Sequence, residues 1–553
     1  MATLLAACGG GGGGASRESS ANQPAAPAQR NGTGDKDAAR TIIGNTWNAV
    51  DGAPRYGGIL QYAPTAPALA NLDPILSASA MVHQVVGNSY SRLIKIGRKP
   101  DDQNALVIFP DAADTWETTD PTTLTFHLRD NVKFHNVAPT NGRALTAEDV
   151  KYSIERSAND KTSQFRGAFG ALDSVQAPDA KTVVVKLKRY DATLPRNLAG
   201  NTTWLVPREL AESANGLKNA VAGTGPFIFE RWEQDSAVYF KKNPEYFLKG
   251  VPFVDELRIL IINDQDARIT AFQTGQAIQM ALSGRQAQRV KQAAPTVQAQ
   301  RYPYVSPYVL FMNFNEPIWK DDRVRKAVSL ALDPDAIIKV AADGEGLWRG
   351  VVSNQHPGWS PSQDDLKSNK YYLRRDVAEA KKLLAAAGHP DGFSTGLMFN
   401  TSYPQAYTSS TQYMQQAFAE IGVKVELNGL EQATFRRNQD IQNYKGLIHG
   451  LDGQGQPEAF LLDYRTGGPK NGSGFSDSEI DRLIDDCNAT IDEEQRRSKA
   501  LDLQRRLLGD VLYKIAIRDE FLQDMWHPWV KNLFSAPPHF YPLAELAYVW
   551  LEK

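Results

Sequence analysis

The stretch VKFHNVAPTNGRALTAEDVKYSIER, residues 132–156, combines a strand-like start with a helix signal. Just before it, TTLTFHLRD begins at Thr122 and alternates apolar and polar residues, as a strand with one buried face does. Inside it, Thr146 and Asp149 stand three residues apart, ahead of apolar residues at helical spacing, which is the pattern of a capping box. A strand followed by a capped helix predicts a chain that mixes α and β structure.

The same alternation of strands and helices continues on both sides of this stretch. Strands are expected at KTVVVKLK and ELRILII. In DDRVRKAVSLALDPDAIIKVA, apolar residues at helical spacing form a stripe that should face a core: Val324, Ala327, Val328 and Ala331. Arg325 and its basic neighbours are expected mostly off this stripe. Asp333 and Asp376 each occupy the N-cap position of a predicted helix.

Length and composition predict several folded units. A chain of 553 residues exceeds one core, and 42% hydrophobic and 22% charged residues are ordinary globular values. The net charge of -2 and the lack of a basic stripe argue against nucleic-acid binding. No apolar run approaches the roughly 18 residues of a membrane-spanning helix. Attachment to a membrane would therefore have to come from an end of the chain.

The two cysteines, Cys8 and Cys487, lie far apart in the sequence, and a disulfide between them is not expected. From Gly9 to about Arg40 the chain is rich in Gly, Ala, Ser, Pro, Gln and Asn and poor in large apolar residues. Such a segment cannot offset the entropy lost on ordering, so we expect a disordered tether.

Familiar catalytic and cofactor motifs are missing from the sequence. None of the eight histidines forms a pair with the spacing of a local zinc site, so no metal centre is expected. His127 and His135 are interpreted as part of a polar strand face. Nucleophile elbow, phosphate-binding loop and dinucleotide fingerprint are absent, and no cofactor is predicted. A glycosidase with two carboxylates facing across a cleft stays open, because sequence does not show their separation.

Several stretches, taken in order, resemble the family 5 extracellular solute-binding proteins, the oligopeptide, dipeptide and nickel class that serves ABC importers. The block at 132–156 resembles the signature of that family. The other landmarks are YGGILQYAPTAPALANLDP near the front, GTGPFIFERWE (223–233), KNPEYF (242–247), NFNEPIWKDDRVRKAVSLALD (313–333), AKKLLAAAGHPDGF (380–393) and the closing HPWVKNL. Together they span residues 56–553.

The resemblance implies an α/β, two-lobed periplasmic-binding-protein-like fold of type II, in the large cluster with an extra subdomain and with crossover strands as the hinge. We expect residues 1–40 to hold a truncated signal remnant, a lipobox and the disordered tether. Lobe I is expected at 41–305 with an extra subdomain at about 90–210, lobe II at 306–523, and a return to lobe I at 524–553. The signature residues are expected to stabilise the fold rather than to contact ligand.

Leu5-Ala6-Ala7-Cys8 looks like a lipobox, in which the thiol of Cys8 is diacylated and the preceding peptide bond is cleaved. Two lipid chains anchor a protein firmly where one is marginal. A secretory signal needs a basic start and an apolar stretch of about 7 to 15 residues, and nothing charged precedes Cys8. We therefore expect the signal peptide to begin upstream of the printed sequence and the protein to be an extracytoplasmic lipoprotein, periplasmic or on the cell surface.

In peptide-binding members of the family, the ligand's amino group is held by an Asp in a lobe II segment of the form G-W-x-x-D-x-x-x-P. The matching stretch here is GLDGQGQP, residues 450–457. Asp452 comes two positions after Gly450 rather than four. Leu451 replaces the aromatic ring, and Gln454 holds the expected Asp position. The match is therefore partial.

Without a carboxylate that reaches the site, a buried ligand cation would have no partner. In that case we expect a neutral ligand such as an oligosaccharide, bound through Gln454, Gln456 and His449. Three further pocket residues are predicted from their places beside the lobe junctions: Tyr62, His83 and Asn315.

The implied function is capture of a peptide-like solute between the lobes by hinge closure, followed by delivery to an ABC permease with its ATPase subunits. We expect a monomer without cofactor or nucleic-acid partner. Three alternatives stay open: the same fold binding an oligosaccharide or other neutral solute, a secreted cleft hydrolase acting as a glycosidase or peptidase, and a surface chaperone or receptor that works without a permease.

Overall fold

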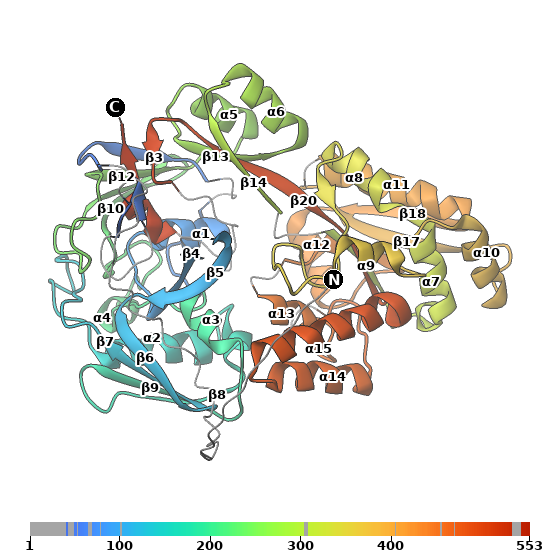
Figure 1. The fold of residues 1–553 in the computed structure, drawn as a ribbon, viewed down its shortest axis with the longest axis horizontal. Coiled ribbons are helices and arrows are strands. Elements are labelled where there is room, and N and C mark those ends of the chain that lie inside the picture. Colours follow the sequence, from blue (N-terminus) through green and yellow to red (C-terminus); the bar gives the residue numbers. More distant parts are fainter. Residues whose placement is uncertain are drawn as a thin grey trace, which may run out of the picture. The chain divides into compact units, whose positions relative to one another are not determined.

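Strands from distant parts of the chain meet in sheets that are flanked by helices (Figure 1). The structure, a computed structural model, describes residues 40–42, 49–51, 53–64, 69–77, 79–99, 102–303, 308–403, 405–453, 456–468, 471–533 and 543–552. In these ranges α-helices and β-strands alternate, so the predicted mixed class is confirmed. No helix there is both long and apolar enough to cross a membrane.

The first part of the chain forms two four-stranded sheets. One has the order β10-β11-β12-β3, with β3 parallel to β12 and the other pairs antiparallel. The other is antiparallel and has the order β6-β7-β9-β8. Their strands are β3 (Ile59–Tyr62), β6 (Ala113–Asp120), β7 (Thr123–Leu128), β8 (Leu172–Gln176), β9 (Thr182–Leu187), β10 (Phe227–Glu233), β11 (Ala237–Lys242) and β12 (Glu256–Leu260).

Three short antiparallel pairs accompany these sheets: β1 (Arg40–Ile42) with β2 (Ala49–Asp51), β4 (Ile94–Lys99) with β5 (Asp102–Pro110), and β21 (Val530–Lys531) with β22 (Trp550–Leu551). The helices of this part are α1 (Ala80–Val86), α2 (Ala147–Asn159), α3 (Leu194–Ala199), α4 (Arg208–Ala211), α5 (Gln265–Gln273) and α6 (Gly284–Ala293).

The later part of the chain contributes an eight-stranded sheet with the order β13-β20-β15-β19-β17-β18, in which β14 and β16 also pair with β20. Its strands are β13 (Gln279–Ser283), β14 (Gln298–Pro303), β15 (Tyr308–Met312), β16 (Gly346–Leu347), β17 (Phe393–Asn400), β18 (Val423–Leu430), β19 (Leu447–Leu451) and β20 (Lys514–Trp526). Its helices are α7 (Asp322–Ala331), α8 (Pro334–Ala342), α9 (Gln363–Ser368), α10 (Val377–Ala386), α11 (Gln405–Glu420), α12 (Gln432–Asp440), α13 (Pro457–Leu462), α14 (Ser478–Ala489) and α15 (Glu493–Arg506).

Helix starts predicted from capping residues are confirmed. Asp333 accepts hydrogen bonds from the backbone of Asp335 and Ala336, and Asp376 accepts one from Glu379. Arg325 differs from the prediction, because it is buried in α7 and donates to backbone carbonyls, including that of Val511 at 2.7 Å. A long side chain on a core-facing helix is buried when its guanidinium finds such acceptors.

The signature block is structural, as expected. The Asp149 carboxylate accepts from the backbone N and Oγ1 of Thr146, which closes the capping box of α2. Arg143 donates to both oxygens of Asp149 at 2.9 and 2.7 Å and to both oxygens of Glu209 at 2.6 and 2.8 Å. This double fork fixes α2 against α4.

The buried side chains of the described residues form two large cores and four small ones. The first core gathers residues between Leu60 and Ile278 together with residues between Val530 and Trp550. The second core gathers residues between Leu310 and Ile517. One of the small cores, called the hinge core here, consists of Phe272, Met280, Leu282, Ala287, Val290, Val297 and Met525.

Strand β20 runs from the second core to the hinge core. Its early residues pair with β15 in the sheet of the second core, while Phe521–Trp526 pair with β14 and Leu522–Trp526 with β13. Because the first core stops at Ile278 and resumes at Val530, the second core is an insertion in it. The chain therefore passes between the cores at two places, along β14–β15 and along β20.

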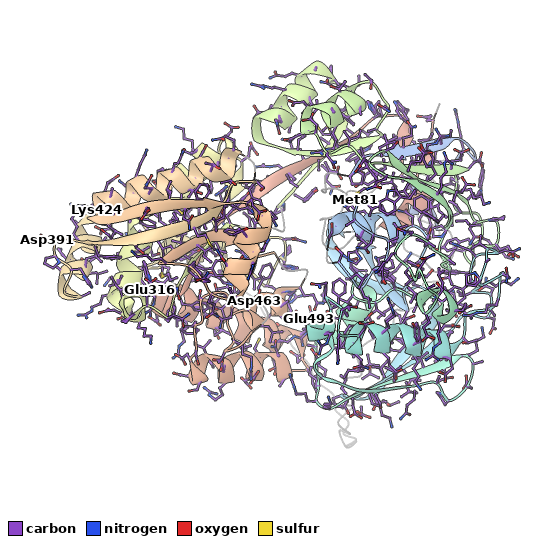
Figure 2. The ribbon with its side chains drawn as sticks, turned by 180° about the vertical axis from the view of Figure 1, so that it is seen from behind. Met81, Glu316, Asp391, Lys424, Asp463 and Glu493 are labelled. Carbon is purple, nitrogen blue, oxygen red and sulfur yellow. The ribbon has the colours of Figure 1, made fainter. Side chains whose placement is uncertain are left out.

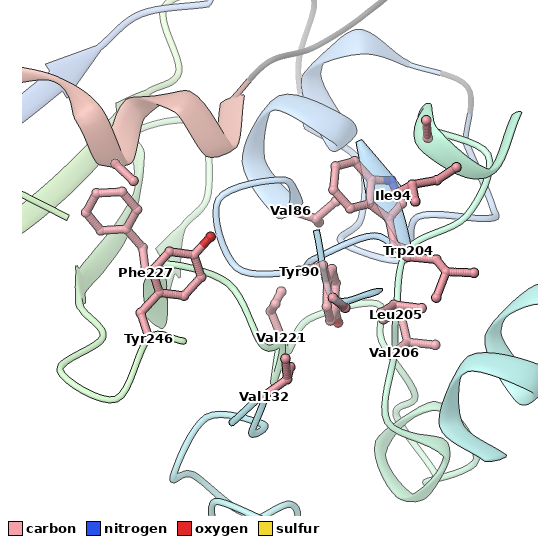
Figure 3. Packing of buried hydrophobic residues seen from close by; sticks show 14 of the residues in the cluster. Val86, Tyr90, Ile94, Val132, Trp204, Leu205, Val206, Val221, Phe227 and Tyr246 are labelled. Atoms are coloured by element: carbon pink, nitrogen blue, oxygen red, sulfur yellow. The ribbon is translucent and has the colours of Figure 1, made fainter. Parts of the chain in front are cut away.

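The GTGP segment lies directly on the backbone of Ser89. Gly225 N donates to the Ser89 carbonyl at 2.7 Å, and a Cβ added at Gly223 would lie 1.8 Å from the same oxygen and 2.8 Å from the Tyr90 ring. Figure 3 shows Tyr90 in this part of the first core. Only glycine allows this close approach of two backbones.

We predict that Gly223→Ala lowers the free energy of unfolding by about 3 kcal/mol or more, because a backbone atom cannot move aside as a side chain can. Chemical denaturation measures the effect. Gly167→Ala is the control, since nothing lies within 4 Å of its added Cβ, and it should change stability by less than about 1 kcal/mol. Equal losses in both variants would contradict the proposed clash.

Two histidines are held neutral in the first core. Burial lowers the pKa of His83 to about 4, a shift that the Ser77 carbonyl opposes and Arg92 assists. Burial likewise lowers the pKa of His135 to about 4, against the opposing hydrogen bond to Gly225. His135 is 1% exposed, so its interpretation as part of a polar strand face is wrong. The side chain of His127, at 49% exposure, does lie on such a face.

Both histidines predict acid sensitivity. Below pH 6.5 these histidines are protonated in the unfolded chain but stay neutral in the folded protein. Their contribution to the free energy of unfolding is therefore fully present above pH 6.5 and is lost as the pH falls toward 4. We expect each histidine to remove about 2 kcal/mol between pH 7 and 5. Denaturant unfolding over this range should show a shallower pH slope in His83→Asn or His135→Asn than in the wild type. A pH slope that neither substitution changes would refute the assignment.

Candidate functional site

The candidate site lies where β20 leaves the sheet of the second core. Strand β20 begins with Lys514 and carries Arg518, Asp519 and Glu520 directly after the apolar residues 515–517. The register places Arg518 opposite Tyr308, and a β-bulge follows between Tyr308 and the next residue. A bulge at this point turns side chains that would otherwise alternate. Charged groups from one strand are thereby brought to a single buried corner, called the β20 corner below.

Asp452, which follows β19, forms the first buried ion pair of the β20 corner. Its Oδ2 lies 2.7 Å from Lys514 Nζ, and both side chains are 1% exposed. The ammonium also lies 4.2 Å from the centre of the Tyr464 ring, a favourable cation–π distance. The carboxylate of Asp452 is thus already matched by a cation of the same chain.

A second pair joins Arg349 to Asp519. Arg349 Nε lies 3.5 Å from Asp519 Oδ1, and the two side chains are 0% and 1% exposed. Asp519 Oδ2 also accepts from the backbone N of Asn354 at 2.7 Å and from Ser353 Oγ at 3.1 Å. Burial raises the pKa of Asp519, and Arg349 and these hydrogen bonds oppose that rise.

The third pair involves Arg518 and reaches β19. Arg518 Nη2 donates to Glu520 Oε1 at 2.5 Å, and the guanidinium lies 4.4 Å from the centre of the Tyr308 ring. Burial, followed by the charge of Arg518, lowers the pKa of His449 well below its usual value. The His449 ring stacks on Tyr407 with centroids 4.2 Å apart. His449 is therefore a neutral, fixed part of this corner.

Several buried polar atoms around these pairs have no hydrogen-bond partner among the described residues: Arg349 Nη1, Gln355 Nε2 and Oε1, His449 Nε2, Tyr464 Oη, and Arg518 Nε and Nη1. Buried polar groups in proteins are nearly always satisfied by protein, water or ligand. The β20 corner therefore offers both donors and acceptors. Its three ion pairs balance in charge, so it presents no excess of either sign.

The residues predicted for lobe II lie together at the end of β19. His449, Gly450 and Leu451 are strand residues opposite Leu310, Val309 and Tyr308 of β15, and Asp452 follows them. Gln454 lies outside the described residues, as does Cys8.

Three other predicted residues lie elsewhere. Tyr62 ends β3, and burial, then the charge of Asp524 on β20, raises its pKa. His83 lies in the first core, where its Nδ1 accepts from Trp204 Nε1 at 3.1 Å. Asn315 is exposed beyond the Met312 end of β15, whereas Leu451 pairs with the opposite end. The structure therefore does not place Asn315 with the residues that end β19.

Gln456 connects the first-core and second-core sides. It precedes α13, and its Nε2 donates to Asn197 Oδ1 of α3 at 2.6 Å. A second approach between the two sides lies nearby in sequence. Burial raises the pKa of Tyr190, and the charge of Arg496 of α15 acts in the opposite direction. Figure 2 locates these helices by Asp463, directly after α13, and Glu493, the first residue of α15.

Sequence reasoning missed the charged residues of β20 and Arg349. A signal existed, because three charged residues in a row within an apolar strand are unusual in a buried position. The ion-pair partners of these residues could not be predicted from the sequence, since Lys514 and Asp452, for example, are 62 residues apart.

Comparison with known proteins gives relatives along most of the chain. Heme-binding protein A of Haemophilus influenzae is 28% identical over 438 residues, which cover 74% of this chain and 77% of that protein. Glutathione-binding protein GsiB of Pectobacterium atrosepticum is 27% identical over 364 residues, covering 65% and 67%.

The fold matches that of the periplasmic binding protein DppA from Helicobacter pylori in complex with the peptide STSA, with a TM-score of 0.76 and 22% identity, over 90% of this chain and 99% of that one. The expected two-lobed periplasmic-binding-protein fold is therefore confirmed. Residues 107–472 match the profile of bacterial extracellular solute-binding proteins, family 5 Middle. The chain belongs to family 5 of the bacterial extracellular solute-binding proteins.

Proposed function

We propose that this protein is the extracytoplasmic substrate-binding lipoprotein of an ABC importer, which captures a peptide-like solute between two lobes and delivers it to the permease. The observation that carries the proposal is the path of β20 together with β14–β15, because two strand connections between two cores allow one core to rotate against the other. Family membership supports the same function. No step of this function makes or breaks a covalent bond of the solute.

In this proposal, lobe I comprises residues 41–305 and 524–553, with the extra subdomain at about 90–210, and lobe II comprises residues 306–523. The solute contacts both lobes and so stabilises the closed arrangement over the open one. Changing an open-to-closed ratio from 99:1 to 1:99 needs a preference of about 5.5 kcal/mol for the closed form. The permease then distinguishes loaded from empty protein by shape.

The lobe II part of the site comprises the residues at the end of β19 and the following segment, namely His449, Gly450, Leu451, Asp452, Gln454 and Gln456. Tyr62, His83 and Asn315 stay proposals for the surrounding pocket. Diacylation of Cys8 would keep this otherwise monomeric protein at the outer face of the membrane, within reach of the permease and its ATPase subunits.

A neutral solute such as an oligosaccharide is the second candidate, and the Lys514–Asp452 pair favours it. An Asp that holds the amino group of a ligand needs a free carboxylate, whereas Asp452 lies 2.7 Å from a buried ammonium. The balanced charges of the β20 corner agree with a ligand that carries no net charge there. The unmet polar atoms of the corner are of the type that binds hydroxyl and amide groups.

We predict that the true solute raises the melting temperature and reduces the radius of gyration. At a concentration of 100 times Kd it should add about 2.7 kcal/mol to the free energy of unfolding. A library of di- to nonapeptides, N-acetylated peptides and oligosaccharides is to be screened by thermal shift, with hits checked by solution scattering. Mass spectrometry of the incubated mixtures provides the control for turnover. Products in these mixtures would favour the hydrolase alternative, and a library without any compacting ligand would contradict capture.

We also predict that Asp452 does not anchor a ligand amine. Asp452→Asn leaves the Lys514 ammonium without its carboxylate and should cost about 3–5 kcal/mol of stability. The double variant Asp452→Asn/Lys514→Met should regain much of that loss and bind any solute found within about threefold of the wild-type Kd. The control pair is Lys499 and Asp486, which lie 2.8 Å apart but are 42% and 52% exposed, so the same double change should cost about 1 kcal/mol or less. Loss of affinity for free-amine peptides alone would restore Asp452 as the anchor.

A further inference from the structure

The two contacts between the first-core and second-core sides share one property, which is that neither needs a ligand. Asn197 and Gln456 bond to each other directly. The guanidinium of Arg496 lies close enough to Tyr190 for its charge to oppose the rise in the pKa of that phenol. We propose that these four residues, called the latch below, stabilise the closed arrangement of the empty protein and thereby set the affinity for every solute by the same factor. The effect on solute affinity rests on the proposed function, whereas the latch contacts themselves do not depend on it.

The first-core side of the latch is held in place by its own neighbours. Asn197 Nδ2 donates to the Ala168 carbonyl at 2.8 Å and to Thr193 Oγ1 at 3.3 Å, so its Oδ1 is the atom left to face Gln456. Asn197 is 8% exposed. A buried amide with a fixed orientation accepts a hydrogen bond without further ordering of its own side chain, which makes the contact more favourable.

The second-core side is equally fixed. Arg496 Nε donates to Glu458 Oε1 at 3.1 Å, and its Nη1 donates to the carbonyls of Thr490 and Ile491. The Arg496 and Glu458 side chains are 8% and 2% exposed. Gln456 is held by the backbone, because it has extended φ and ψ angles as the N-cap of α13 and precedes Pro457.

The latch lies away from the strands that join the cores. In Figure 1, α3 lies near α13 and α15 in the lower half of the view, whereas β13, β14 and the paired part of β20 lie at the top. A rotation about β14 and β20 therefore separates Asn197 from Gln456 more than it disturbs the hinge core. Contacts made in only one of two states shift the equilibrium toward that state.

The effect on binding follows from population. When only the closed state holds solute, the apparent Kd equals the intrinsic Kd divided by the closed fraction. A net hydrogen bond between neutral groups changes an equilibrium by about 2- to 10-fold. Loss of one latch contact should therefore weaken all solutes by the same factor of about 2 to 10, whatever their chemistry, and mainly by faster dissociation.

The test uses isosteric variants. Gln456→Glu keeps the size of the side chain but places acceptor oxygens against Asn197 Oδ1, and Tyr190→Phe removes only the hydroxyl. Gln495→Glu is the matched control, because it adds the same charge at an exposed glutamine of α15. Circular dichroism and denaturant unfolding establish that each variant is folded.

Solution scattering without any ligand is the deciding measurement. The double variant Gln456→Glu/Tyr190→Phe should have a larger radius of gyration than wild type, whereas Gln495→Glu should not. Unchanged ligand-free scattering in the double variant overturns the latch even if solutes still bind. A solute library without hits, combined with the expected expansion, would instead refute the proposed function and leave the latch standing. Where solutes are known, weakening of some but not others would show direct ligand contact and also contradict the latch.

Discussion

Strand β20 is the constraint on which the rest of the structure depends, because its two ends satisfy their backbone hydrogen bonds with different partner strands of the eight-stranded sheet. Its start belongs to the sheet of the second core, and its end pairs with β13 and β14 beside the hinge core. A strand that bonds on both sides cannot be cut without leaving unpaired groups in both places. The bulge beside Tyr308 marks the change from one sheet partner to the next. In the proposed function, rotation of one core against the other would be concentrated where the ladder is already irregular.

The charged residues on both sides of the bulge have a positional role. Buried ion pairs seldom add net stability, since the loss of hydration roughly cancels the attraction. They do penalise any arrangement that separates them, and Arg349–Asp519 ties the loop after β16 to the crossing strand. Lys514–Asp452 ties the end of β19 to the same strand. These pairs therefore position the segment that carries the proposed ligand contacts against the crossing strand rather than against the outer helices.

Much of the fold was predictable because its signals are local. Caps such as Asp333 and Asp376 depend on neighbours within three or four residues, and the Thr146–Asp149 box does as well. Burial of single polar residues was not predictable. Arg325 and His135 are buried only because distant carbonyls reach them, those of Val511 and Gly225. The same contrast holds for the candidate site. The stretch around Asp452 was predictable from its motif. The pairing of Asp452 with Lys514 was not, because it depends on a sheet register that no local pattern encodes.

The insertion of the second core within the first has a consequence for biogenesis. Val530, Leu533 and residues 546–550 complete the first core, and the backbone N of Phe253 donates to the carbonyl of Ala547. A chain emerging from the ribosome or from an export channel exposes the body of the first core long before its last pieces arrive. The second core is continuous in sequence, so its folding requires no residue after β20. The second core is therefore expected to fold before the first core, against the order of synthesis. The unfinished amino-terminal part would then need protection by chaperones until the chain is released.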